Sequence, residues 1–103
     1  MDSKPDRKAN AKYRKKRSIR EKLADAYDDE LLFMDGYDCC IVGVAGRIGF
    51  ETMLVYDREK VLETLVKEGM TYEDAVDFHE FNQAGSYVGE RTPMFITLLE
   101  DIP

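Results

Sequence analysis

The stretch that decides the fold spans residues 53–69 and reads MLVYDREKVLETLVKEG. Its first four residues form a short apolar run, which is typical of a buried strand. Asp57 follows as a residue suited to capping a helix N-terminus, and Gly69 is a typical helix stop. Apolar residues recur between them at helical spacing, at Val61, Leu62, Leu65 and Val66. The stretch therefore predicts one strand leading directly into one amphipathic helix.

The chain after this stretch predicts a second helix, a turn region and a last strand. Thr71 is a suitable N-cap, and the apolar positions that follow it are Ala75, Val76, Phe78, His79 and Phe81. We expect this helix to end near Ala84 and the region 85–93 to form turns, with positive φ at Gly85 and Gly89. Residues 94–99 predict a strand whose expected partner is the strand at 53–56.

The chain before this stretch begins with a capping box, Ser18-Ile19-Arg20-Glu21. An apolar stripe follows it at Ile19, Leu23, Tyr27, Leu31 and Met34, and predicts a helix of about four turns that Gly36 ends. The apolar run in residues 38–49 is compatible with a strand or a helix. We favour a helix that Asp38 caps, with Gly43, Gly46 and Gly49 on one face at i, i+3 and i+6, where a neighbouring element could approach closely.

These elements predict a single α+β domain over residues 18–103, preceded by a basic arm over residues 1–17. The domain should contain three or four helices packed on a small two- or three-stranded sheet. A chain of 103 residues with 44% hydrophobic side chains can bury one modest core. The arm has almost no large apolar side chain, so we expect it to be disordered when it is free.

Composition also excludes several classes of protein. The longest apolar run, residues 39–46, is too short to cross a bilayer, so we expect no contact with a membrane. The N-terminus lacks the apolar core of a secretory signal. Two adjacent cysteines cannot form a disulfide framework, and a reducing cytoplasm is the expected location.

Charge divides sharply along the chain. Residues 1–20 carry nine basic and two acidic side chains, a net charge of +7, whereas residues 21–103 carry six basic and nineteen acidic, a net charge of −13. Dense basic tracts neutralise nucleic-acid phosphates, and an aromatic residue among them can stack on a base. The expected partner is therefore RNA or DNA. The candidate nucleic-acid-binding residues are Lys4, Arg7, Lys8, Lys12, Tyr13, Arg14, Lys15, Lys16, Arg17 and Arg20. The alternatives are a solubilising tail and an arm that docks on acidic protein, including its own domain.

The acidic domain supports a second hypothesis. A dense negative surface can imitate the phosphates of a nucleic acid and occupy the basic groove of a host nuclease, polymerase or defence effector. Asp28, Asp29 and Glu30 are the candidate residues for such a protein partner. An ordinary solvated acidic face is the alternative interpretation.

The loop between the second helix and the last strand is a further candidate site. It mixes small, aromatic and hydrogen-bonding residues, and its candidate partner-binding residues are Asn82, Tyr87, Glu90 and Thr92. A structural turn is the favoured alternative. A third hypothesis makes the chain an enzyme that uses this loop with His79, Glu90 and Asp57, but no nucleophile is placed near His79, which we interpret as structural.

The sequence predicts no catalytic residue, no metal site and no cofactor. Cys39, Cys40 and His79 lack the paired spacing of a zinc site, and we expect both cysteines to be small buried hydrophobes. The glycines of residues 43–49 have the wrong spacing for a dinucleotide fingerprint. The oligomeric state is left open.

Three segments carry a resemblance to a known family: Tyr37–Ala45, Val55–Asp57, and Phe81–Asn82 with Gly85–Pro93. In order and spacing they resemble small uncharacterised proteins of tailed bacteriophages and prophages, over roughly residues 35–96. This resemblance implies a phage protein that acts in the bacterial cytoplasm, in host takeover or defence evasion. It implies no active site, and the basic arm lies outside it.

Overall fold

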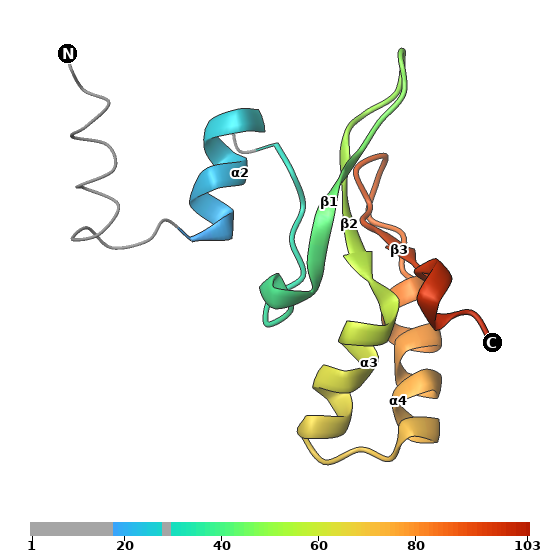
Figure 1. Ribbon diagram of the computed structural model, residues 1–103. Coiled ribbons are helices and arrows are strands. Elements are labelled where there is room, and N and C mark those ends of the chain that lie inside the picture. Colours follow the sequence, from blue (N-terminus) through green and yellow to red (C-terminus); the bar gives the residue numbers. More distant parts are fainter. Residues whose placement is uncertain (1–17, 28–29) are drawn as a thin grey trace, which may run out of the picture.

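The computed structural model describes residues 18–27 and 30–103, and within them it shows an α+β fold (Figure 1). Three helices accompany one three-stranded mixed sheet. The elements follow in the order α2 (Ile19–Tyr27), β1 (Ile41–Ala45), β2 (Met53–Asp57), α3 (Arg58–Lys67), α4 (Tyr72–His79) and β3 (Met94–Ile96). Single turns of 3₁₀ helix lie at Asp38–Cys40 and Leu99–Asp101, and α4 continues into a π-helical turn at Glu80–Ala84. The predicted fold class is confirmed.

Strand β2 is the middle strand of the sheet. It pairs with β1 in an antiparallel hairpin and with β3 in parallel, as expected for the strand at 53–56. Helices α3 and α4 pack side by side at one end of the molecule, and the β1–β2 hairpin extends towards the opposite end (Figure 1). Strand β3 is shorter than predicted and ends at Ile96.

The core lies where β2 and α3 meet. Its buried side chains are Leu31, Cys40, Leu54, Tyr56, Val61, Leu62, Leu65 and Ala75. Three of the four apolar positions predicted on α3 are buried, whereas Val66 is exposed. Burial of these side chains is the main favourable term in the stability of so small a domain.

Three of the four predicted helix starts, at Ser18, Asp57 and Thr71, are confirmed in atomic detail. The Asp57 carboxylate accepts hydrogen bonds from the N–H groups of Glu59 and Lys60, and the Thr71 hydroxyl accepts one from a backbone N–H in the first turn of α4. At α2 the capping box is reciprocal. The backbone N–H of Glu21 donates to Ser18 Oγ, and the backbone N–H of Ser18 donates to the Glu21 carboxylate, both at 3.1 Å. Side-chain oxygens therefore satisfy donors that a helix start leaves open.

The helix predicted over residues 38–49 is wrong, because residues 41–45 form strand β1. An apolar run can satisfy its backbone groups in either way, and here β2 offers a ladder of hydrogen-bond partners. The register of the β1–β2 pair shifts between Ile41 and Gly43. Asp38 begins a single 3₁₀ turn and caps no helix.

The first helix is also shorter than predicted. It ends at Tyr27, and residues 30–34 have no helical structure. The stripe predicted for this helix includes Leu31 and Met34, but Leu31 is buried in the core and the backbone N–H of Met34 donates to the Tyr56 hydroxyl at 2.7 Å. Contacts with β2 replace helical hydrogen bonds for this segment, so tertiary packing overrides the helical pattern.

Two glycines of the hairpin provide a test of its geometry. A Cβ atom added at Gly43 would meet open space, whereas Gly49 has a φ of +88°. Gly43→Ala should raise the free energy of unfolding by about 0.5 kcal/mol, because it removes unfolded-state entropy without strain. Gly49→Ala should lower it by about 1 kcal/mol, because a side chain disfavours the left-handed conformation. Urea unfolding measures both, and equal effects would contradict the hairpin.

The adjacent cysteines differ, since Cys40 is buried as predicted and Cys39 is exposed. Burial raises the pKa of the Cys40 thiol to about 11 from 9.0, and burial also raises the pKa of Tyr56. The folded state therefore holds these protons to higher pH than the unfolded state does. The free energy of unfolding that the protonated Cys40 thiol contributes should be fully present below pH 9. It should fall by about 2 kcal/mol as the pH rises to 11.

Urea unfolding at several pH values measures this loss of stability. Cys40→Ala should reduce the slope between pH 9 and 11, although it also lowers stability at neutral pH by leaving a small cavity. Cys39→Ala is the comparison variant and should reduce the slope less, because burial, and not the contact with Cys39, is the largest cause of the raised Cys40 pKa. A slope insensitive to both substitutions would exclude the Cys40 thiol as its source.

Candidate functional site

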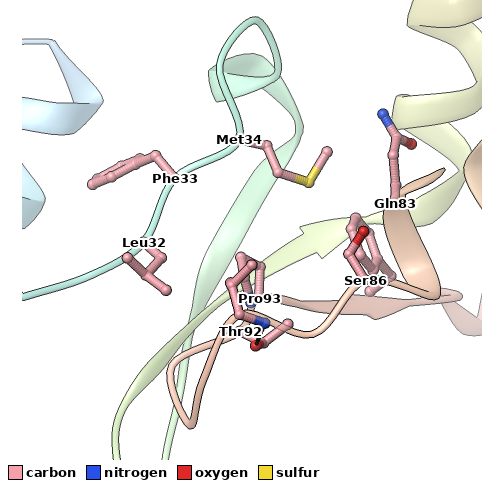
Figure 2. A pocket seen from close by; sticks show the side chains of 9 residues that line it. Leu32, Phe33, Met34, Gln83, Ser86, Thr92 and Pro93 are labelled. Carbon is pink, nitrogen blue, oxygen red and sulfur yellow. Dashed lines mark hydrogen bonds between the residues drawn. The ribbon is translucent and has the colours of Figure 1, made fainter.

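A pocket of about 430 Å³ lies between the segment before β1 and the loop before β3 (Figure 2). We call it the loop pocket. It is lined by Leu32, Phe33, Met34, Gln83, Ser86, Val88, Thr92, Pro93 and Phe95. One wall comes from residues 32–34, and the opposite wall comes from the end of the π-helical turn, the following loop and β3. The pocket is of a size that holds one small molecule or one or two side chains.

The two hydroxyl groups on the wall of the loop pocket are already engaged within the chain. The Ser86 hydroxyl donates to the Asn82 carbonyl at 3.0 Å. The Thr92 hydroxyl donates to the Gly89 carbonyl and accepts from the Val88 N–H. Since these groups need no further partner, the pocket presents mainly apolar surface to an occupant.

His79 supports the pocket wall from behind. It is buried, its Nδ1 lies 2.7 Å from Gln83 Oε1, and its ring meets Phe95 edge-on with 4.6 Å between centroids. The Nε2 atom is buried and has no hydrogen-bond partner among the described residues. The contacts with Gln83 and Phe95 are therefore the ones through which His79 supports the wall.

The loop itself is built around two glycines. Gly89 has a φ of +119°, as predicted. Gly85 does not have the predicted positive φ, because its φ is −83°. Its glycine character serves a close approach instead, since a Cβ atom at Gly85 would lie 2.9 Å from the Glu80 carbonyl oxygen. The turn character of the loop is confirmed.

Arg91 joins this loop to two other parts of the molecule. Its guanidinium donates to the Thr52 carbonyl at 3.0 Å, pairs with Glu30 at 2.7 Å and pairs with Glu51. Glu51 and Thr52 lie in the loop that joins β1 to β2, directly before β2, and Glu30 precedes residues 32–34 of the pocket wall. A planar guanidinium with several donors suits such a three-way contact. Arg91 therefore fixes the loop, the hairpin and the segment at 30–34 to one another.

The predicted loop residues differ in their position relative to the loop pocket. Thr92 lines the loop pocket, whereas Asn82, Tyr87 and Glu90 are exposed and are not among the residues that line it. Glu30, predicted for a partner, pairs with Arg91. Asp28, Asp29 and the arm residues before Ser18 lie outside the described residues.

Sequence reasoning missed the apolar wall of the pocket and the role of Arg91. One signal was present for the wall. Leu31, Leu32, Phe33 and Met34 are four consecutive apolar residues, which an amphipathic helix with one buried stripe does not explain. No pattern in the sequence indicates the Arg91 contacts, because they join residues 39 and 61 positions away.

Arg20, predicted to bind nucleic acid, lies in an internal cluster. Its guanidinium donates to Asp38 at 2.8 Å and to Asp35 at 3.0 Å, and it lies 4.5 Å from the centre of the Phe33 ring. These hydrogen bonds, first to Asp38 and then to Asp35, raise the pKa of Arg20. The cluster holds α2 against the segment that forms the pocket wall.

The residues of the enzymatic hypothesis have separate positions and partners. The Asp57 carboxylate caps α3, His79 contacts Gln83, and Glu90 is exposed on the loop. In residues 18–27 and 30–103 no hydrogen bond or ion pair joins the three. The same ranges contain no group of three or more His, Cys, Asp or Glu residues that could hold a metal ion.

Comparison with protein-family models, with curated proteins and with solved structures gave no significant match for this chain. Among the described residues, every helix is too short or too polar to cross a membrane.

Arg91→Met tests the three-way contact. It should lower the free energy of unfolding by about 1–2 kcal/mol, because it removes charge-assisted hydrogen bonds and leaves the Thr52 carbonyl without its donor. Arg58→Met is the matched control, since Arg58 makes one long contact of 3.4 Å with an exposed carboxylate of Glu80. That change should cost less than about 0.5 kcal/mol. Urea unfolding compares the two, and equal losses would contradict a special role for Arg91.

Proposed function

We propose that this chain is a non-enzymatic binding protein whose basic arm contacts the phosphates of RNA or DNA. The observation that carries the proposal is the charge division, with +7 in residues 1–20 and −13 in the remainder. Basic side chains release condensed counterions when they neutralise phosphates, and this release drives association. Tyr13 lies among them and offers a ring for stacking on an unpaired base.

The charge of the domain supports the arm as the place of contact. Helix α4 exposes three carboxylates, at Glu73, Asp74 and Asp77, and they repel a polyanion from that face. Arg20 is already bound to two carboxylates within the chain. We therefore assign the phosphate contacts to the basic residues before Ser18, with Arg20 as the residue that anchors α2 to the domain.

The acidic face of α4 favours a second candidate function. In this candidate the domain occupies the basic groove of a host nuclease, polymerase or defence effector. The resemblance to phage proteins gives both candidates the same setting, the cytoplasm of a bacterial host during takeover or defence evasion. Glu73, Asp74 and Asp77 are the residues that such a groove would contact.

Deletion of residues 1–17 tests the first candidate. The full chain should bind labelled RNA or DNA with an affinity that falls steeply with salt, at a logarithmic slope of about −5 if roughly six charges contact phosphates. The deleted chain should lose this affinity and keep its urea unfolding midpoint. Fluorescence anisotropy at several salt concentrations measures the affinity of both chains. Equal affinity with and without the arm would contradict the proposal.

Replacing charged residues separates the two candidates. A chain with Lys15→Gln, Lys16→Gln and Arg17→Gln should lose affinity for nucleic acid and reduce the salt slope by about 3. A chain with Glu73→Gln, Asp74→Asn and Asp77→Asn should keep that affinity. The second candidate function is tested by purifying the bound partners of each chain from a bacterial lysate that has been treated with nuclease. A host protein that binds the chain lacking residues 1–17, but does not bind the chain with the three α4 substitutions, would support the second candidate function.

A further inference from the structure

The tip of the β1–β2 hairpin, residues 46–50, exposes two large apolar side chains. Ile48 is fully exposed and 67% of Phe50 is exposed, although both belong to a chain with a buried core of its own. The tip extends away from α3 and α4 (Figure 1). The guanidinium of Arg47 lies 5.2 Å from the centre of the Phe50 ring. Exposed Phe and Ile residues beside an Arg are the composition of an interface core.

The hairpin is also nearly free of charge. Residues 39–56 contain two charged side chains, Arg47 and Glu51, in a chain whose residues are 35% charged. Glu51 follows the tip directly and pairs with Arg91, so Arg47 is the charge that the tip itself presents. This low charge favours an apolar protein surface as the partner over a polyanion, which would demand several cations.

The same chain contains a cavity with matching chemistry. The loop pocket is walled by Leu32, Phe33, Met34, Val88, Pro93 and Phe95, and the hydroxyls of Ser86 and Thr92 on its wall are bonded internally (Figure 2). Its volume of about 430 Å³ is large enough for the Phe50 ring with part of Ile48. The carboxylate of Asp35, next to Met34 in the chain, pairs with Arg20 through one oxygen and is otherwise exposed, so it can also accept from Arg47 of a second copy.

We propose that two copies of this chain form a reciprocal dimer, in which the hairpin tip of each copy occupies the loop pocket of the other. Ile48 is fully exposed, so none of residues 18–27 and 30–103 covers this side chain. The arrangement places apolar side chains in an apolar pocket and Arg47 beside Asp35. A two-fold axis makes both contacts identical, as in an isologous dimer.

The area of the contact requires the exchange to be reciprocal. An aromatic side chain buries about 150–250 Å², so one tip in one pocket covers roughly 600 Å² when both surfaces are counted. That area is typical of a crystal contact, whereas two such contacts reach roughly 1,200 Å², the lower limit for a specific interface. The dimer should therefore be reversible and depend on protein concentration.

Sedimentation equilibrium of the full chain, freed of nucleic acid, tests the dimer. The wild type should show a monomer–dimer equilibrium between low and high micromolar concentration. Ile48→Ser with Phe50→Ser should raise the dimer dissociation constant at least about tenfold, because apolar anchors dominate such interfaces. Val88→Asp, which places a charge in the loop pocket, should do the same.

Leu99→Ser is the matched control, since Leu99 is 88% exposed and belongs to neither surface. It should leave the dissociation constant unchanged, and all three variants should keep the wild-type unfolding midpoint. A chain that stays monomeric, open-ended polymers, or an equal effect of Leu99→Ser would each overturn the proposal. A tip that serves a different protein would appear as a monomeric chain.

A photoreactive phenylalanine analogue at position 50 tests the position of the contact. Cross-linked dimers should carry the adduct on residues 32–34 or 86–95 of the second copy, read by mass spectrometry. Adducts elsewhere would overturn the proposal. These variants leave residues 1–17 intact, so the nucleic-acid affinity of the arm is measured separately and succeeds or fails independently of the dimer.

Discussion

Burial of Tyr56 in the middle of the sheet is the constraint on which the rest of the structure depends. Its side chain is fully buried, and its hydroxyl accepts the Met34 N–H at 2.7 Å. Its ring lies 5.8 Å from that of Phe95, and its backbone lies opposite Ile41 on one side and Phe95 on the other. One residue therefore brings together three segments that are distant in the chain. A polar atom on a large apolar body suits this position, because the hydroxyl finds a partner while the ring fills the core.

The loop pocket is a consequence of that arrangement. Met34 and Phe95, which contact Tyr56, lie on its opposite walls, and His79 supports Phe95 from behind. Arg91 adds the second fixed point, since it ties the loop to the hairpin and to Glu30. The cavity is consequently held open by packing and hydrogen bonds between elements, and it needs no occupant to form.

Charge gives the molecule three surfaces with different chemistry. The arm is cationic, the exposed side of α4 is anionic, and the β1–β2 hairpin is nearly neutral with an apolar tip. Each surface suits a different partner, because polyanions, basic grooves and apolar pockets place different demands on charge and desolvation. The proposed nucleic-acid binding by the arm and the proposed self-association through the hairpin therefore rest on separate residues. In a dimer the two arms would also be joined, which raises their effective concentration on one nucleic acid.

The sequence by itself determined the elements whose signals are local. Asp57, Thr71 and the Ser18–Glu21 pair mark helix starts through hydrogen bonds that span two or three residues. The run at 53–56 indicates a strand because it is short and a helix N-cap, Asp57, follows it directly. The α+β class and the charge division follow from the same local reading. Tertiary structure decided the rest. Residues 41–45 form a strand because their backbone groups pair with those of β2. Residues 30–34 are not helical because they contact Tyr56 and the core instead. The loop pocket combines walls about fifty residues apart, and the energy of such contacts depends on partners that no local pattern specifies.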